Sequence, residues 1–104
     1  MKRFRVVFLL SFVVLMFSTL LYAQNIGNGK ALFNDTKLGG GSTGKSCNSC
    51  HPAGKGIKPE TTNSTRLEDI VNGCITGPLA GTALQKDSQQ MKDIVAYIKS
   101  IVKK

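Results

Sequence analysis

The chain is short and basic. It has 104 residues, with 14 Lys and Arg against 6 Asp and Glu, and a formal net charge of +8 at pH 7. This length leaves room for one small domain and excludes a multidomain enzyme. The three cysteines are an odd number, so they cannot all pair with one another inside one chain.

The N-terminal segment has the pattern of an export signal. Lys2, Arg3 and Arg5 precede an almost wholly apolar run from Val6 to Ala23. This pattern predicts a signal peptide over residues 1–23, cleaved after Ala23, and a domain over residues 24–104. The run of about 18 residues is also just long enough to span a bilayer, so retention as a membrane anchor is the alternative. We expect an exported, periplasmic protein that touches the membrane only if residues 6–23 are kept.

A helix and a glycine-rich loop are predicted next. Ile26–Asp35 reads as a short helix capped by Asn25 or Asn28. Residues 37–46 form the loop, in which residues 39–46 match the phosphate-binding pattern G-x-x-x-x-G-K-S. That motif requires a buried strand before it, whereas a helical segment precedes it here. The loop is therefore expected to be a flexible surface connection without a nucleotide.

The motif C-x-x-C-H occupies Cys47-Asn48-Ser49-Cys50-His51 and is the attachment signature of c-type haem. Positions three apart lie on one face of a helical turn, so Cys47 and Cys50 can both form thioethers with one macrocycle. His51 would be the proximal iron ligand. A redox dithiol and half of a zinc site are the alternatives. A redox dithiol of the thioredoxin type requires a βαβ context, and a zinc site requires another pair of ligands. One covalent haem c is therefore the predicted cofactor.

The loop after the motif offers a candidate hydrogen-bond partner for His51. Residues 52–59 contain two prolines and two glycines, which exclude long regular structure. The carbonyl of Pro59 is the candidate acceptor for the free N–H of His51, because metal-bound imidazoles usually donate to such a group.

Two more helices complete the domain. Thr65 and Glu68 form a capping box for a helix that is expected to stop at Gly73. A second loop over residues 74–81 should follow. The final helix is predicted from near Ser88 to the chain end, because apolar residues recur there at spacings of three and four.

This order of elements resembles a small all-α class I cytochrome c domain, and the resemblance covers essentially all of residues 24–104. The matching features are Gly29 and Phe33 in the first helix, the C-x-x-C-H motif, and residues 96–100 of the last helix. The first and last helices of that family cross at glycine and aromatic positions. The resemblance therefore implies that Gly29, Phe33 and Tyr97 meet.

The sixth iron ligand departs from the family pattern. The family has a methionine in the loop before the last helix, often followed by proline, whereas Gly77 precedes Pro78 here. Met91 lies inside the last helix, on its apolar stripe, where methionine is more often a packing residue. The odd cysteine, Cys74, falls in the predicted second loop and can face the iron as a thiolate. Cys74 and Met91 are both retained as candidates.

A second resemblance favours Cys74. The segment Cys74…Gly81…Leu84…Asp87-Ser88…Met91…Tyr97 is similar to the haem domains of thiosulfate dehydrogenases. In those domains a cysteine seven residues before such a glycine ligates the iron, and sulfur-oxidation cytochromes carry related haems. Those enzymes hold two haems, whereas this chain has one C-x-x-C-H motif.

The charge pattern predicts the kind of partner. Lys45, Lys55 and Lys58 flank the motif, and Lys86 lies in the facing loop. A positive rim around a haem edge steers a protein to an acidic patch on a redox partner. A generally basic soluble surface is the alternative. The domain has few aromatics and no basic stripe along one helix, so no nucleic-acid partner is expected.

Three functions are compatible with these features. The first is a carrier of single electrons, which needs no substrate pocket. The second is a haem subunit or enzyme of thiosulfate-type oxidation that uses Cys74. The third is a redox or gas sensor with an open iron site.

Overall fold

The structure is a computed structural model that describes residues 24–102, and this part of the chain is an all-α globule without strands. Its helices are α2 (Ile26–Phe33), α3 (Cys47–Cys50), α4 (Pro59–Thr62), α5 (Leu67–Thr76) and α6 (Gln89–Ile101), with 3-10 turns η1 (Leu38–Gly40) and η2 (Pro52–Gly54). The predicted signal peptide or anchor lies outside the described residues. Within residues 24–102, no helix is both long enough and apolar enough to cross a bilayer.

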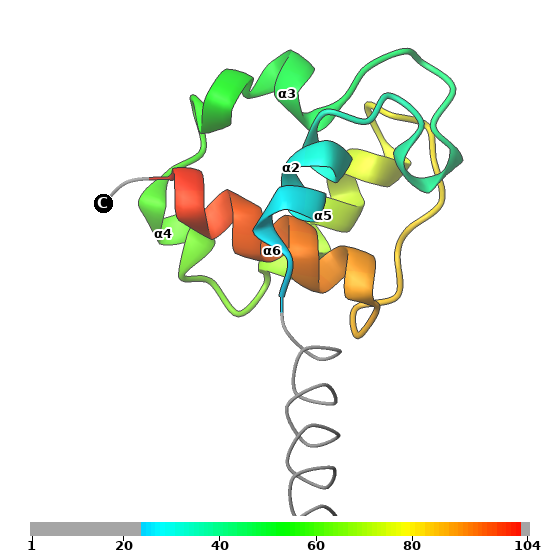
Figure 1. Cartoon of the computed structure of the whole chain (residues 1–104). Helices are drawn as coiled ribbons and strands as arrows, with labels where there is room; N and C mark the ends of the chain where they lie inside the picture. Colours follow the sequence, from blue (N-terminus) through cyan, green and yellow to red (C-terminus); the bar gives the residue numbers. More distant parts are fainter. Residues whose placement is uncertain (1–23, 103–104) are drawn as a thin grey trace, which may run out of the picture.

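The crossing of α2 and α6 is the most closely packed part of the fold (Figure 1). A Cβ atom at Gly29 would lie 2.0 Å from the backbone oxygen of Asp93, so only glycine lets the two helices approach this closely. The rings of Phe33 and Tyr97 pack edge to face, with centroids 5.3 Å apart. The predicted meeting of Gly29, Phe33 and Tyr97 is confirmed.

A buried carboxylate ties the same two helices together. Asp93 is 1% exposed and accepts hydrogen bonds from the backbone N–H of Asn25 (2.8 Å), from Asn28 Nδ2 (2.7 Å) and from Gln89 Nε2 (2.7 Å). Burial raises the pKa of Asp93, but these three hydrogen bonds outweigh burial and hold the pKa below its ordinary value. The side chain is therefore ionised at neutral pH, which sequence reasoning did not anticipate.

Helices α2 and α6 each begin directly after a residue whose side chain caps the helix N-terminus. The Asn25 side chain accepts from the N–H of Asn28, which confirms Asn25 as the cap of α2, although α2 ends at Phe33 rather than at Asp35. The Ser88 hydroxyl accepts from the N–H of Met91 at 3.2 Å, so α6 begins where predicted. The apolar stripe of α6 is buried, as its spacing indicated.

Helix α5 differs from its prediction at both ends. Its N-cap is Arg66, which makes no side-chain capping bond, so the proposed capping box of Thr65 and Glu68 is wrong. The helix also continues through Gly73 to Thr76. The reason is packing: Ile75 is fully buried and extends the apolar face by another turn. Cys74 consequently lies in a helix rather than in a loop.

The glycine-rich loop is tied to the loop that follows α5. Thr82 donates its N–H to the Gly39 carbonyl at 2.7 Å, and Ser42 donates its N–H to the Leu79 carbonyl at 3.0 Å. Gly39 has φ +65°, and a Cβ atom there would lie 2.5 Å from the Thr82 carbonyl oxygen. The expected flexible connection is therefore held in place by hydrogen bonds to the second loop. Gly39, the first glycine of the phosphate-loop-like pattern, allows the two loops to pack closely.

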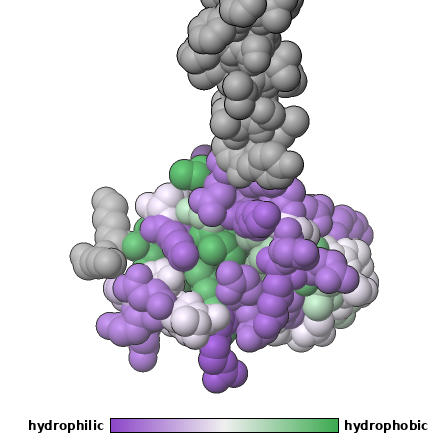
Figure 2. Space-filling model, turned by 90° about the horizontal axis from the view of Figure 1, so that it is seen from below, coloured by the Kyte–Doolittle hydropathy of each residue, from purple (hydrophilic) through white to green (hydrophobic). Residues whose placement is uncertain are grey.

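Hydrophilic residues cover most of the face shown in Figure 2, with apolar side chains gathered near its middle. Among the described residues, two large apolar side chains are exposed, Ile26 at 50% and Ile70 at 43%. Ile70 stands on α5 at the edge of the cavity described next.

Candidate functional site

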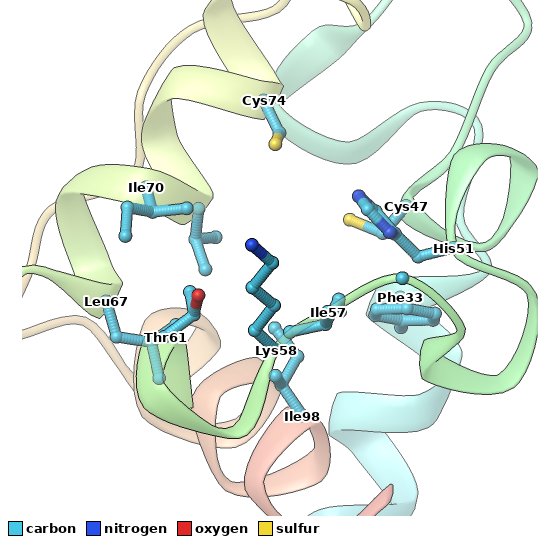
Figure 3. A pocket seen from close by; sticks show the side chains of 12 residues that line it. Phe33, Cys47, His51, Ile57, Lys58, Thr61, Leu67, Ile70, Cys74 and Ile98 are labelled. Atoms are coloured by element: carbon cyan, nitrogen blue, oxygen red, sulfur yellow. The ribbon is translucent and has the colours of Figure 1, made fainter. Parts of the chain in front are cut away.

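A cavity of about 330 Å³ lies between α3, the segment leading into α4, α5 and α6 (Figure 3). Its lining residues are Phe33, Cys47, His51, Gly56, Ile57, Lys58, Thr61, Leu67, Ile70, Val71, Cys74 and Ile98. Most of these side chains are apolar. Pockets that hold cofactors and other small molecules measure roughly 300–1,000 Å³ and are lined in this way.

Helix α3 brings part of the C-x-x-C-H motif to one wall. The N–H of Ser46 donates to Ser49 Oγ at 2.9 Å, and the N–H of Ser49 donates back to the Ser46 carbonyl at 3.1 Å, which fixes the single turn. Cys47 is half-buried and lines the cavity beside His51. Cys50 is exposed and is not among the lining residues.

The His51 ring is oriented by a backbone carbonyl. Its Nδ1 lies 3.0 Å from the carbonyl oxygen of Lys55. A carbonyl can only accept, so Nδ1 carries the proton, and Nε2 of the neutral ring keeps a free lone pair. The acceptor predicted from the sequence was Pro59. Its carbonyl instead accepts from Thr62 Oγ1 at 2.7 Å inside α4, so that prediction is corrected to Lys55.

A tight turn explains why Lys55 takes this role. Ala53, Gly54 and Gly56 all have positive φ, and the turn η2 bends the chain back over His51 within four residues. A Cβ atom at Gly56 would lie 3.4 Å from His51 Nδ1. Glycine at this position therefore suits the turn through its positive φ of +85°, and an added Cβ would be in ordinary van der Waals contact with the ring.

Cys74 faces the cavity from the opposite wall. It lies in the last turn of α5, is half-buried, and its sulfur points into the cavity toward the side that holds Cys47 and His51 (Figure 3). Burial, followed by the electrostatic influence of Cys50, raises the pKa of Cys74. Burial, followed by the influence of Cys74, raises the pKa of Cys47 to about 11. Both groups are therefore thiols at neutral pH when no ligand occupies the cavity.

Met91, the other candidate for the sixth ligand, has a different environment. It is 1% exposed within the hydrophobic core and is not among the residues that line the cavity. Of the two candidates, the structure brings only Cys74 to the same cavity as His51.

Sequence reasoning missed several lining residues. Ile57 and Lys58 come from the segment that leads into α4, and Thr61 comes from α4 itself, a four-residue helix too short to show a helical period. Phe33 and Ile98 come from α2 and α6, so the crossing of those helices supplies part of the wall. Leu67 and Val71 were recognised as an apolar face, but the sequence does not say what that face contacts.

The polar groups of the cavity are few. No cluster of three or more His, Cys, Asp or Glu side chains suited to a metal ion occurs within residues 24–102, so the ligand set of a structural zinc site is not found there. His51, at the end of α3, and Cys74, in α5, line the cavity from different elements. Comparisons with protein-family models, with curated proteins and with solved structures give no match for this chain. The function is therefore inferred from the residues of the site.

Proposed function

We propose that the chain is a c-type cytochrome with a class I cytochrome c fold. One haem c would be attached through Cys47 and Cys50, with His51 as the proximal ligand. The observation that carries this proposal is that Cys47, His51 and Cys74 reach one apolar cavity. The Lys55 carbonyl additionally holds the His51 ring in the tautomer that leaves Nε2 free for a metal.

Within this class, the function that the site supports best is the carriage of single electrons. When bound, the haem iron supplies a centre that alternates between ferric and ferrous states. The chain's own contribution is to exclude water from the ring with apolar side chains and to hold the imidazole in place. Among the described residues the cavity is lined by no carboxylate, and its ionisable groups are the thiols of Cys47 and Cys74, His51 and Lys58.

The proposed partners are redox proteins with an acidic surface. Lys45, Lys55 and Lys58 are exposed around the site. Lys86 forms an ion pair with Asp69 and contributes less positive potential than the sequence suggested. We place the protein outside the cytoplasm, in the periplasm, either released after Ala23 or anchored through residues 6–23, and we expect no nucleic-acid partner.

Covalent attachment of haem is the test of this proposal. The full chain is expressed in a bacterium that carries a c-type haem attachment system, and the purified protein is denatured and extracted with acidified solvent. We expect haem to remain on the wild-type chain and to be lost from the Cys47→Ala/Cys50→Ala variant. Haem that is extracted from the wild type as easily as from the double variant would exclude a c-type cytochrome.

Oxidation of thiosulfate or a similar sulfur species through Cys74 is the second candidate function. The observation that favours it is the Cys74 sulfur facing the cavity, while Met91 is packed in the core. A thiolate ligand stabilises ferric iron and lowers the reduction potential, whereas a methionine thioether raises it.

Spectra of the ferric protein separate the two candidates. The optical and low-temperature EPR spectra are recorded for the wild type, Cys74→Ala and Met91→Leu. If only Cys74→Ala changes the spectra, Cys74 is the ligand and thiosulfate turnover becomes the next assay. If only Met91→Leu changes them, the protein is a high-potential electron carrier and Cys74 is not a ligand.

A further inference from the structure

Lys58 is exposed to solvent, and its side chain also lines the mainly apolar cavity. It is the N-cap residue of α4, and its ammonium group extends into the middle of the cavity among Ile57, Ile70 and Thr61 (Figure 3). No carboxylate lines the cavity. Within residues 24–102 the ion pair that forms joins Lys86 to Asp69, so Lys58 has no acidic partner there.

The backbone aims this side chain inward. Lys58 is extended, with φ −77° and ψ 143°, which is the conformation that a following proline favours. Pro59 then starts α4 with its ring-restricted φ. Thr61, one turn along α4, lines the same cavity. Pro59 and α4 therefore set the backbone conformation from which the Lys58 side chain enters the cavity.

An ammonium group beside apolar walls is stable when an anion accompanies it. Removal of water from an unpaired charge is unfavourable, and a carboxylate that forms a charge-assisted hydrogen bond offsets that cost. When the cavity is filled by an apolar group, the water around Lys58 is displaced. A carboxylate carried by the group that fills the cavity would form a charge-assisted hydrogen bond with the ammonium group there.

We infer that Lys58 is the residue that binds a carboxylate of the bound group. This inference rests on the proposed function, under which the carboxylates are the propionates of haem. A haem is a flat apolar ring with two carboxylate side chains, so it matches a cavity with apolar walls and one ammonium group. Lys58 is thus a positioning residue that also neutralises negative charge near the iron.

The reduction potential reports this charge. Without the ammonium group, the carboxylate keeps its full negative charge near the iron and stabilises the ferric state. The Lys58→Met variant should therefore have a lower midpoint potential than the wild type. A pair that is shielded from solvent should keep this effect in 1 M salt, where the Debye length is about 3 Å and exposed charges are screened.

The experiment is a redox titration of the haem-loaded full chain at low salt and in 1 M salt. For Lys58→Met, we expect the ferric-to-ferrous ratio at a fixed potential to rise about tenfold, which is about 59 mV for one electron. Lys58→Arg keeps the charge and should stay within about twofold of the wild type. The matched control is Lys55→Met, which removes an exposed charge from the same loop but keeps the backbone carbonyl that His51 uses. Its effect should be below about threefold at low salt and disappear in 1 M salt.

Three results overturn the inference. If Lys58→Met and Lys55→Met shift the ratio equally, or if the Lys58→Met shift disappears in 1 M salt, Lys58 is only a surface charge, and the proposed function stands. If the wild-type chain attaches no haem, the proposed function and this inference both fail. Lys58→Gln provides a second neutral variant with a polar tip for the same titration, should Lys58→Met be exported without haem.

Discussion

The α2–α6 crossing and the cavity beside it are adjacent but differ in what completes them. At the crossing, Gly29 brings two backbones into contact, and the Asp93 carboxylate receives three donors from the chain itself. In the cavity, Lys58 and the Nε2 atom of His51 have no partner among residues 24–102. The crossing is complete as a protein structure, whereas the cavity has polar groups that a ligand would satisfy.

The two regions share residues, which explains how one supports the other. Phe33 packs on Tyr97 at the crossing and also lines the cavity, and Ile98 does so from α6. Residues of the crossing therefore form part of one cavity wall. Changes at the crossing should lower the stability of the whole domain, and changes around the cavity should act mainly on the site.

The largest effect is expected from Gly29→Ala. The added Cβ would overlap the Asp93 backbone oxygen, so α2 and α6 must separate, at a cost of about 3 kcal/mol in the free energy of unfolding. Urea unfolding of the haem-loaded protein measures it. Gly27→Ala is the matched control in α2, since its Cβ would approach only the Asn25 side chain, at 3.3 Å. Equal effects of the two variants would show that the close crossing does not determine stability.

Asp93→Asn should be next and should change the pH dependence. The replacement puts an amide donor against groups that already donate, and we expect a loss of about 2 kcal/mol at pH 7. Because the pKa of Asp93 is lowered in the folded state, its contribution is present above the unfolded pKa of about 3.9 and is lost as the pH falls through the folded pKa. Unfolding at pH 7, 5 and 3 should show less acid destabilisation in the variant. The exposed Asp69→Asn serves as the control, and a comparable loss in that variant would contradict the role of Asp93.

Asn72→Ala should have an intermediate effect, on the connection between α5 and the loop that follows it. The Asn72 side chain donates to the Leu84 carbonyl at 2.9 Å and accepts from the Leu84 N–H at 2.8 Å, which ties the loop after α5 to that helix. Loss of both bonds should cost about 1.5 kcal/mol in thermal or urea unfolding. Asn34→Ala removes one exposed hydrogen bond to Lys30 and should cost less than about 0.5 kcal/mol. A smaller loss for Asn72→Ala than for Asn34→Ala would mean that the loop is held in another way.

Gly56→Ala should have the smallest effect on the free energy of unfolding, and its main effect should be on the His51 ring. Gly56 has φ +85°, where an L-residue costs about 1 kcal/mol, and its new methyl would contact the His51 ring. Gly44→Ala also places an L-residue at a positive φ, +77°, but meets nothing within 4 Å. We expect similar stability losses for both variants and a shifted His51 ring signal by NMR for Gly56→Ala alone. If the His51 ring signal shifts in both variants or in neither, contact at Gly56 does not determine the orientation of the His51 ring.

Local signals in the sequence predicted where α2 and α6 begin, which face of α6 is buried, and two of the cavity residues. Asn25 and Ser88 cap α2 and α6 as expected, and the spacing of apolar residues identified the buried face of α6. The C-x-x-C-H motif likewise singled out Cys47 and His51, which both line the cavity. These features depend on residues within a turn or two of one another, which is the range over which capping and periodicity act.

Tertiary packing decided the rest. Helix α5 passes Gly73 because Ile75 is buried in the core, and this places Cys74 on a helix facing the cavity. The acceptor for His51 is Lys55 because a turn with positive φ folds the chain back sooner than the sequence suggested. Asp93 is buried because donors from α2 reach it across the crossing. In each case the decisive contacts join residues whose proximity no local pattern records, since it arises only when apolar faces pack together.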